Sequence, residues 1–395
     1  MERSSSTIDK NSMHIDKSMD DYVPLRDIAI KDLVVLIFMK PNSLHLDPYL
    51  ICVMEYLQKF NISCFVTERV LEMVKEYVEE ATENAEIDPT LEDKVPKLDL
   101  DRVEIVTDSN QNKINRVITL GGDGTVVQCI KLFYKDKCPK MITFSEESIG
   151  YLCCFESSSY EEVLYHSLIK IAPDREEFEV PNTFDDNDPQ FQTPYVEMRQ
   201  RVVLKVDLGD LDTSVKSTFD PNKKKKPKFG SLYSLNQITI DRGSYNYLTN
   251  IECSINDHPL TMIQGDGVII SSPTGSTAYN MSAGGSIVYN YVNCMLLTPI
   301  CPHSLSFRPL ILPDDCKVTF KASPNSRADH YNVSLDGDHM FKLKRGQKID
   351  IHGSMCTLPF VTFETKDPLE EWCKRLNDSL HWNSRPVQKT FAKEK

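Results

Sequence analysis

The sequence predicts two packed domains: a doubly wound α/β domain with a parallel sheet, followed by a domain rich in β-strands. In the first part of the chain, apolar runs of strand length alternate with helical patterns, whereas beyond about residue 181 short strands follow one another with turn residues between them. A chain of 395 residues with 40% hydrophobic content is long enough for about two cores. We expect a polar tail at 1–30, the α/β domain at 31–180, the β-rich domain at 181–365, and a C-terminal segment at 366–395 that packs back on the body.

Composition and charge exclude several classes of protein. The formal net charge of −13 argues against a general nucleic-acid binder, because a phosphate backbone requires a basic surface. No apolar stretch has the length of a membrane span, and the first residues lack the apolar core of a signal peptide. The 12 cysteines form neither a zinc pattern nor a small disulfide framework, which favours a reducing compartment. We therefore expect a cytoplasmic protein without nucleic-acid or membrane partners.

The α/β pattern begins with an apolar run at 33–39, which is typical of a strand buried on both faces of a sheet. Asp47 and Pro48 then have the pattern of an N-cap followed by proline at the first helical position. Apolar residues at helical spacing follow up to Phe60, and a second short strand is expected at 62–66. These segments predict a strand, helix, strand unit.

The next region, at about 79–104, is acidic and interrupted by prolines, and we interpret it as a solvated insertion. The pattern resumes with a strand at 116–120, a helix, and a strand at 141–144. Ser159 and Glu162 have the spacing of a capping box for the helix that comes next. This alternation predicts a parallel sheet.

The turn after the strand at 116–120 has the sequence Gly-Gly-Asp-Gly-Thr, at 121–125. Its glycines let main-chain N–H groups approach a phosphate closely, and Thr125 can open a helix whose N-terminus attracts anions. Asp123 places one carboxylate among these donors, which suits phosphoryl transfer. A plain structural turn is the alternative, because glycine turns after buried strands are common. This turn and a second one at 145–151 both lie at the carboxyl edge of the predicted sheet, where α/β domains bind ligands.

The second domain is expected to consist of short strands. Their expected positions are 202–206, 231–240, 251–255, 268–271, 318–321, 331–335, 349–352 and 360–363. A polar insertion at about 207–228 ends in a lysine-rich run, which is either a solvated loop or a targeting or anion-binding patch. The run Asp336-Gly337-Asp338 is either a charged turn between strands or a metal or ribose site.

The most specific stretch lies at 265–285 and joins a carboxylate, a strand, a hydroxyl-rich turn and the start of a helix. Ser276 or Thr277 can cap this helix, and their hydroxyls, with that of Thr274, can bind phosphate or ribose. Tyr279 offers a flat ring face and a hydroxyl to a base or a sugar. A capped helix without a ligand is the structural alternative.

Together these motifs resemble those of the NAD kinase family. The family's G-G-D-G-T turn matches 121–125, and its block D-G-x-x-x-x-T-P-T-G-S-T-A-Y-x-x-S-A-G-G matches 266–285 with Ser272 in place of threonine. The family's L-N-E strand motif matches 235–237 imperfectly. Two further segments are similar to the eukaryotic branch of the family, at 297–309 and 380–389. The resemblance covers about 33–391, apart from the two polar insertions.

The resemblance implies an NAD kinase-like fold, with a Rossmann-like N-terminal domain, a C-terminal β domain, and NAD bound in the cleft between them. It implies an ATP-dependent kinase that moves the γ-phosphoryl group of ATP onto the 2′-hydroxyl of the adenosine ribose of NAD, with Mg²⁺ accompanying ATP. Because the transition state of phosphoryl transfer is loose, positioning and charge neutralisation matter most. Asp123 is expected to orient the hydroxyl and to accept its proton. We also expect a homo-oligomer, either a dimer or a tetramer.

The resemblance assigns the site residues to two groups. Those expected to bind phosphate are Gly121, Gly122, Gly124 and Thr125. Those expected to contact NAD are Asp123, Gly124, Tyr151, Asn236, Gln237, Asp266, Thr274, Thr277, Ala278, Tyr279 and Ser282. No resident metal site is expected.

Two departures from the family pattern bear on function. Gln237 replaces the family's acid, which removes a negative charge, and we expect a changed affinity for NAD or a changed preference between NAD and NADH. Glu147 replaces a glycine in the second turn and adds charge near a polyphosphate. Two other functions therefore stay open. One is a catalytically weak homologue that binds dinucleotide as a sensor or oligomer partner, and the other is a lipid kinase, since lipid kinases resemble this family around the G-G-D-G turn.

Overall fold

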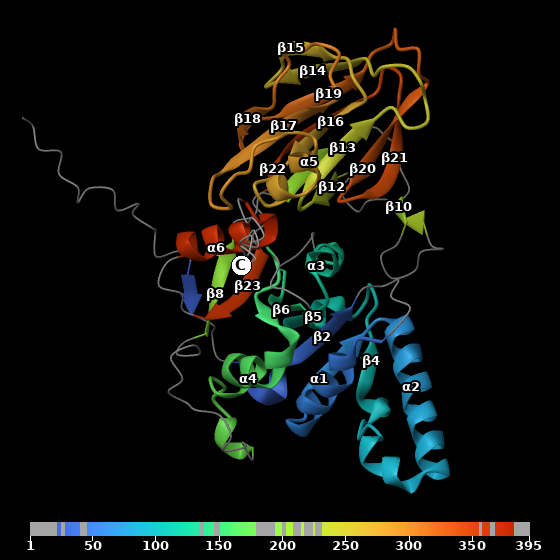
Figure 1. The fold of residues 1–395 in the computed structure, drawn as a ribbon, viewed down its shortest axis with the longest axis vertical. Helices are drawn as coiled ribbons and strands as arrows, with labels where there is room; N and C mark the ends of the chain where they lie inside the picture. The colour runs from blue at the N-terminus through green and yellow to red at the C-terminus, as the bar shows by residue number, and fades with distance from the viewer. Residues whose placement is uncertain are drawn as a thin grey trace, which may run out of the picture.

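The structure has two lobes, an α/β lobe below and a β-rich lobe above in Figure 1. The structure is a computed structural model. It describes residues 22–24, 28–39, 46–133, 138–145, 151–178, 194–199, 203–207, 215–216, 224–225, 231–354, 358–363 and 368–382. The predicted fold class is therefore confirmed.

The α/β lobe is built on a nine-stranded sheet with the order β1-β8-β23-β6-β5-β2-β3-β4, in which β7 also pairs with β6. Its strands are β1 (Tyr22–Pro24), β2 (Val34–Met39), β3 (Ser63–Val66), β4 (Val103–Ile105), β5 (Arg116–Leu120), β6 (Lys140–Ser145), β7 (Phe155–Glu156), β8 (Pro194–Arg199) and β23 (Leu358–Phe363). Its helices are α1 (Pro48–Lys59), α2 (Glu68–Ile87), α3 (Asp123–Ile130) and α4 (Tyr160–Leu164). Strands β2 to β7 pair in parallel, as the alternation of strands and helices predicts.

Apolar side chains fill both faces of this sheet. Successive residues of β2 alternate between the faces, because Val35 and Ile37 belong to the cluster with α1 while Leu36 and Phe38 belong to the cluster with α3. This two-sided burial explains why the sequence of β2 is continuously apolar.

The local helix signals give one correct and one wrong prediction. The Asp47 carboxylate accepts a hydrogen bond from the Tyr49 N–H at 2.8 Å, which confirms the predicted N-cap of α1. The predicted capping box at Ser159 is wrong, because the Ser159 hydroxyl donates to the Glu156 carbonyl at 2.8 Å instead. This hydrogen bond belongs to the 3₁₀ turn that precedes α4. A π-helical turn, Tyr165–Ile169, extends the helix at its other end.

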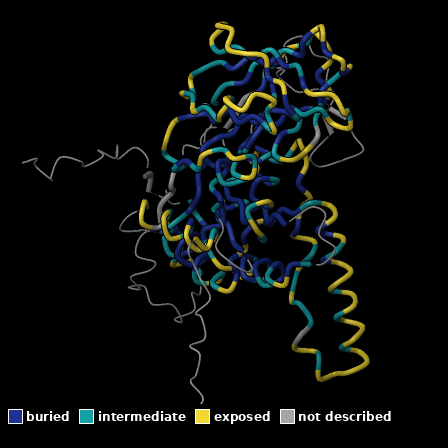
Figure 2. Tube along the Cα trace, turned by 45° about the horizontal axis from the view of Figure 1, so that its top comes forward, coloured by how far each residue is buried: buried dark blue, intermediate teal, exposed yellow. Residues whose placement is uncertain are grey.

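The acidic insertion is solvated but not irregular. Helix α2 runs 20 residues, and its buried residues, Val70, Leu71 and Val74, all lie in its first half. Figure 2 shows the rest of the helix exposed on an arm that projects from the lobe. The short 3₁₀ helices Pro89–Lys94 and Leu100–Arg102 lead back to β4, which pairs in parallel with β3. The end of the predicted insertion therefore belongs to the sheet.

The β-rich lobe consists of two six-stranded antiparallel sheets packed face to face. One has the order β12-β9-β22-β19-β14-β15 and the other the order β18-β17-β16-β13-β20-β21. The strands of the first are β9 (Val203–Asp207), β12 (Ser231–Ser234), β14 (Ile251–Ile255), β15 (His258–Ile263), β19 (Val318–Ala322) and β22 (Lys348–Ser354). Those of the second are β13 (Gln237–Asp241), β16 (Gly267–Ser271), β17 (Cys294–Ile300), β18 (Leu310–Pro313), β20 (His330–Leu335) and β21 (Asp338–Lys344). One apolar cluster fills the space between them.

Several strand predictions need correction. The expected strand at 231–240 is two strands, because the chain leaves β12 in one sheet and enters β13 in the other. The expected strand at 360–363 is β23, which belongs to the α/β lobe, where its alternate residues fill the clusters on both faces of the sheet. Strand β8 also joins that sheet, and β1, within the expected polar tail, pairs with β8.

The predicted lysine-rich insertion contributes a small hairpin, β10 (Val215–Lys216) with β11 (Lys224–Lys225). The rest of that insertion lies outside the described residues. Among the helices that the structure describes, none has the length and apolarity of a membrane span.

The C-terminal helix α6 (Pro368–Leu380) lies at the level of the junction between the lobes (Figure 1). The ring of its Trp372 packs edge-to-face on Tyr289 of the β-rich lobe, with the ring centroids 5.2 Å apart. Leu376, one turn further along α6, is buried. Because Tyr289 follows the block at 266–285, helix α6 packs beside that motif.

Candidate functional site

The glycine turn joins β5 to α3 at the carboxyl edge of the parallel strands. Gly121 has a φ of +124°, and a Cβ at this position would lie 2.6 Å from the Thr125 hydroxyl oxygen, so the turn requires glycine here. At Gly122 and Gly124 a Cβ would meet no atom of the described residues within 4 Å. Helix α3 begins at Asp123. The turn thus has open space in front of the N-terminus of α3, as a phosphate site requires.

The Asp123 carboxylate reaches from this turn to the segment after β6. Its Oδ1 accepts hydrogen bonds from the N–H groups of Leu152, at 2.9 Å, and Cys153, at 3.1 Å, and its Oδ2 accepts one from the Tyr151 N–H at 2.8 Å. The two segments meet because β5 and β6 are parallel neighbours whose carboxyl ends lie at one edge. A carboxylate oxygen can accept two hydrogen bonds. Among the described residues only the Tyr151 N–H donates to Oδ2, so Oδ2 can accept a second hydrogen bond from a hydroxyl group.

The charge of Asp123 contributes to raised pKa values at Tyr151 and Cys153. Burial raises the pKa of Tyr151, the Ser379 hydroxyl on α6 opposes that increase, and the charge of Asp123 adds to it. Burial, with the Asp123 charge next, also raises the pKa of Cys153. Cys153 therefore stays a protonated thiol at neutral pH and is no nucleophile. Glu147, the departure in this turn, lies outside the described residues.

The carbonyls of Leu235 and Asn236 are docked on the start of the second motif. The Leu235 carbonyl accepts the Ser272 hydroxyl at 2.5 Å. The Asn236 carbonyl accepts the Ser272 N–H at 2.9 Å and the Ser271 hydroxyl at 3.0 Å. A Cβ at Gly275 would lie 2.0 Å from the Asn236 carbonyl oxygen, so only glycine allows this approach. The structure therefore brings the two predicted dinucleotide segments of the β-rich lobe together.

Leu235 links this segment to the α/β lobe. Its side chain is fully buried and belongs to the same apolar cluster as Val126, Val127 and Ile130 of α3. The helix that carries Asp123 and the segment that carries Asn236 therefore share one core across the boundary between the lobes.

The predicted cap in the second motif is wrong. The motif forms a 3₁₀ helix, Thr274–Thr277, and then α5 (Tyr279–Ser282), whose N-cap residue is Ala278. The Ser276 hydroxyl donates to the Val288 carbonyl at 3.2 Å and accepts the Val288 N–H at 3.0 Å, so it anchors the chain that follows instead of a helix end. The Thr277 hydroxyl lies 3.4 Å from the Thr274 carbonyl.

Two side-chain atoms in this region are buried without a hydrogen-bond partner in the part of the chain that the structure describes. They are the Gln237 amide oxygen and the Thr274 hydroxyl oxygen. An unpaired buried polar atom is costly, so such atoms indicate a ligand or ordered water. Both belong to residues that the sequence assigns to NAD.

The other residues predicted to contact NAD lie just before β16 and in the 3₁₀ helix and α5 that follow it. Asp266 pairs with the Arg242 guanidinium, with 2.7 Å between Oδ1 and Nε. The side chain of Tyr279 is 43% exposed, and its pKa is raised by burial and by the charges of Asp241 and Asp266 among its neighbours. Thr277 and Ala278 are half-buried, and Ser282 is exposed at the end of α5. Asp266 and Tyr279 are therefore close together.

Sequence reasoning missed three sets of contacts in this arrangement. Asp336 lies in the turn between β20 and β21, as predicted, but its carboxylate also accepts hydrogen bonds from the segment at 234–237. The Lys131 ammonium is 2.7 Å from Asp338, and Arg242 pairs with Asp266. The Asp-Gly turn signal was visible in the sequence, but these partners are remote along the chain and gave no local signal.

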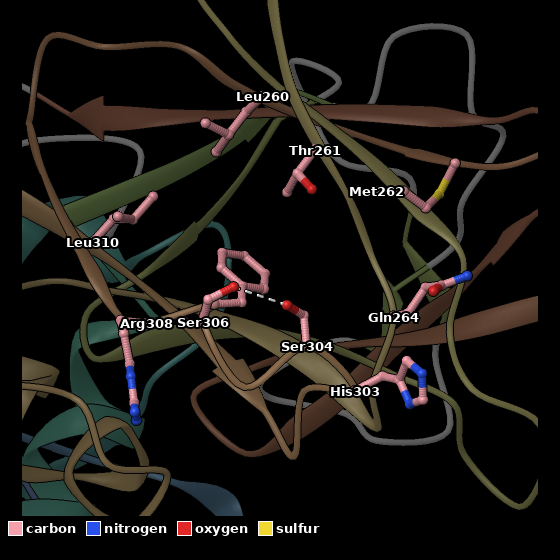
Figure 3. A pocket seen from close by; sticks show the side chains of 10 residues that line it. Leu260, Thr261, Met262, Gln264, His303, Ser304, Ser306, Arg308 and Leu310 are labelled. Atoms are coloured by element: carbon pink, nitrogen blue, oxygen red, sulfur yellow. Dashed lines mark hydrogen bonds between the residues drawn. The ribbon is translucent and has the colours of Figure 1, made fainter.

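A hollow of about 370 Å³ lies elsewhere on the β-rich lobe, between β15 and the segment before β18 (Figure 3). His303 and Arg308 of the family segment 297–309 line it together with Leu260 and Met262. None of the residues predicted to contact NAD or phosphate lines this hollow. Within the described ranges, no three His, Cys, Asp or Glu side chains are grouped as a metal ion requires.

Two family models match the chain. The model of the ATP-NAD kinase N-terminal domain matches residues 35–169, and that of the ATP-NAD kinase C-terminal domain matches residues 235–363. The chain is 35% identical over 286 residues to a chloroplastic NAD kinase 2 of Arabidopsis thaliana, which covers 72% of this chain and 25% of that protein. It is 36% identical over 280 residues to an ATP-NADH kinase of Saccharomyces cerevisiae, covering 70% of this chain and 50% of that protein. This chain thus spans half or less of each of these two relatives.

Solved structures of related proteins have the same fold. A yeast NADH kinase complexed with NADH superposes with a TM-score of 0.64 at 25% identity, over 93% of this chain and 91% of that one. An NAD kinase of Archaeoglobus fulgidus in complex with ATP has a TM-score of 0.54 at 16% identity, over 87% and 99% of the two chains.

Proposed function

Because the chain belongs to the NAD kinase family, we propose that it transfers the γ-phosphoryl group of ATP to the 2′-hydroxyl of the adenosine ribose of NAD. The products are NADP and ADP, and NADH is a second possible acceptor. The observation that carries the proposal is the position of Asp123 at the start of α3, a helix whose apolar residues share a core with Leu235, the neighbour of Asn236.

Asp123 is the general base of this proposal. The 2′-hydroxyl donates to Oδ2, the carboxylate oxygen with an acceptor position left, and the three N–H donors fix the direction in which the carboxylate points. The 2′-oxygen bonds to the γ-phosphorus as the bond to the bridging oxygen of ADP breaks, and the hydroxyl proton passes to Asp123. The open backbone at Gly122 and Gly124 gives the phosphates access to the N–H groups at the start of α3.

The β-rich lobe supplies the dinucleotide contacts. The unpaired oxygens of Gln237 and Thr274 accept from ribose hydroxyls or from the amino group of the base. The exposed ring of Tyr279 packs on a base or a sugar.

Mg²⁺ enters with ATP in this account. Mg²⁺ keeps several waters and binds one or two carboxylates together with substrate phosphates. The described residues offer no cluster of three ligands, and Oδ1 of Asp123 already accepts two N–H donors. The residues therefore fit an ion held mainly by the phosphates and water, which neutralises charge during transfer.

A coupled assay tests this function. The purified chain is incubated with Mg-ATP and either NAD or NADH, and NADP or NADPH is measured through a dehydrogenase that requires it. We expect product with at least one acceptor. Dinucleotide binding without product would favour the catalytically weak homologue, and phosphorylation of diacylglycerol or a sphingoid base in place of the dinucleotide would favour a lipid kinase.

A homo-oligomer is the expected assembly. Strands β15 and β18 are the edges of the two sheets on the side of the hollow, and four large apolar side chains are exposed there. They are Leu260, Met262, Leu305 and Ile311. Burial of these edges against a second copy would cover them. Light scattering during gel filtration should give the mass of a dimer or tetramer, and a monomer at micromolar concentration would contradict this.

The proposed location is the cytoplasm. None of the described cysteines is in a disulfide, which fits a reducing compartment. Related proteins carry chloroplastic and mitochondrial names, so the location needs a direct test. Cell fractionation should place the protein with cytosolic markers, and recovery with organelles would overturn this assignment.

A further inference from the structure

The turn between β20 and β21 presents two carboxylates to two different parts of the candidate site. Asp336 and Gly337 both have positive φ, +48° and +84°, which is the geometry of a tight hairpin turn. Asp336 points to the chain between β12 and β13, and Asp338 points to the end of α3.

Asp336 accepts four hydrogen bonds from that chain. Its Oδ1 accepts the Ser234 hydroxyl at 2.6 Å, the Asn236 N–H at 2.7 Å and the Gln237 N–H at 3.2 Å, while its Oδ2 accepts the Leu235 N–H at 2.9 Å. The chain passes from one sheet to the other at this point, and Leu235 and Asn236 belong to neither ladder. A carboxylate suits the position because it has two oxygens and no hydrogen of its own.

The same segment is held from its other side by Ser271 and Ser272, which bind the carbonyls of Leu235 and Asn236. With amides and carbonyls both engaged, the backbone of the segment has one orientation. The direction of the Asn236 and Gln237 side chains then depends on Asp336.

Asp338 contacts the other half of the site, which is helix α3 with Asp123 at its start. Its Oδ2 is 2.7 Å from the Lys131 ammonium, and the Lys131 side chain is only 9% exposed while that of Asp338 is 50% exposed. Lys131 follows the last residue of α3, the helix that begins at Asp123. A cation at a helix C-terminus is also favoured by the helix dipole.

We propose that the β20–β21 turn positions the two halves of the site relative to each other across the boundary between the lobes. Asp336 sets the backbone of the dinucleotide segment, and the Asp338–Lys131 ion pair sets α3 and with it Asp123. Asp336, Asp338 and Lys131 are positioning residues, since they act through other residues. The proposal deepens the proposed function and rests on it.

Asp336→Asn tests the proposed role of Asp336. Asparagine tolerates a positive φ, so the turn itself is kept. Its amide oxygen can replace Oδ1, but its NH₂ group then meets the Leu235 N–H, donor against donor. We expect the KM for the dinucleotide to rise about tenfold, with the KM for ATP changed less than about twofold. Asp329→Asn is the matched control, because this exposed carboxylate pairs only with Arg345 among the described residues.

A double-mutant cycle of Lys131→Met and Asp338→Asn tests the proposed role of the Asp338–Lys131 ion pair. Each single variant should lower kcat by about threefold with little change in the KM for the dinucleotide, and the double variant should be no worse than either single one. The two roles can thus be distinguished, because loss of Asp336 should change KM and loss of Lys131 should change kcat. Additive losses, or equal effects on KM and kcat in both sets of variants, would contradict the proposal.

Hydrogen exchange gives a measurement that does not depend on activity. The amides of Leu235, Asn236 and Gln237 should exchange at least about tenfold faster in Asp336→Asn than in the wild-type chain. If Asp336→Asn does not fold, Ser234→Ala removes one of the four donors and should still speed the exchange of these amides. A wild-type chain that makes no NADP overturns the proposed function, whereas unchanged exchange and unchanged KM in an active enzyme overturn the positioning role alone.

Discussion

The two halves of the candidate site are held by different kinds of contact. The glycine turn and Asp123 are fixed locally, by the end of β5, the start of α3 and the neighbouring end of β6. The segment at 235–237 is fixed by side chains from two remote parts of the chain, Ser271 and Ser272 at the end of β16 on one side and Asp336 on the other. The first half is thus built within an α/β unit, whose helix α3 then contacts the β-rich lobe through Lys131 and Asp338, whereas the second half exists only when the β-rich lobe has folded.

The largest effect is expected at the locally fixed half. In Asp123→Asn the carboxamide cannot accept the hydroxyl proton, so kcat for NADP formation should fall by about 10²- to 10⁴-fold. The same assay and a thermal melt of the variant separate catalysis from folding. Undiminished activity in a folded variant would remove Asp123 as the base.

The remotely fixed half should be the more sensitive to added volume. Gly275→Ala places a methyl group 2.0 Å from the Asn236 carbonyl, which cannot move because Ser271 and Ser272 hold it. We expect the free energy of unfolding to fall by about 1–3 kcal/mol in a denaturant titration. An unchanged midpoint would mean that the two segments do not pack as the structure has them.

Gly124→Ala is the matched change in the locally fixed half. A Cβ there meets no atom within 4 Å, and alanine is the better helix former by up to about 1 kcal/mol. Stability should therefore rise slightly, while the added methyl group obstructs the phosphates and lowers kcat/KM for ATP. Full activity in this variant would place the phosphates elsewhere.

A smaller effect is expected from restoring the family's acid. In Gln237→Glu the NAD dissociation constant should fall about fivefold, because a charged acceptor makes stronger hydrogen bonds to ribose hydroxyls. Gln264→Glu, at an exposed position outside the site, is the control. Equal affinities by calorimetry would show that the lost charge has no bearing on dinucleotide binding.

The smallest effects separate the two cap predictions of the α/β lobe. Asp47→Ala should lower the free energy of unfolding by about 1 kcal/mol, because the carboxylate caps α1. Ser159→Ala should change it by less than about 0.5 kcal/mol, since its hydroxyl caps no helix. Equal losses in chemical denaturation would contradict the difference between the two caps.

Sequence reasoning reached the features that depend on neighbours along the chain. It located β2, α1 and β5, the Asp47 cap, and the glycine turn at the edge of the sheet, because each has a local periodicity or a turn residue with a physical reason. The motifs also led to the family and to the fold class.

It failed where the decisive contact is remote. The segment at 231–240 reads as one strand, and only the hydrogen bonds to Asp336 and Ser272 show why it breaks at Leu235 and Asn236. Strand β23 is assigned correctly only when its neighbour β6 is known. Ser276 has the pattern of a cap but binds Val288, which no local rule predicts.

The most direct test of the account is a crystal structure of the protein with NAD and a non-hydrolysable ATP analogue. We expect the dinucleotide between α3 and the segment at 235–237, with its adenosine 2′-oxygen about 2.6–3.2 Å from Oδ2 of Asp123. A dinucleotide bound in the hollow beside His303, or one whose 2′-hydroxyl faces away from Asp123, would contradict it.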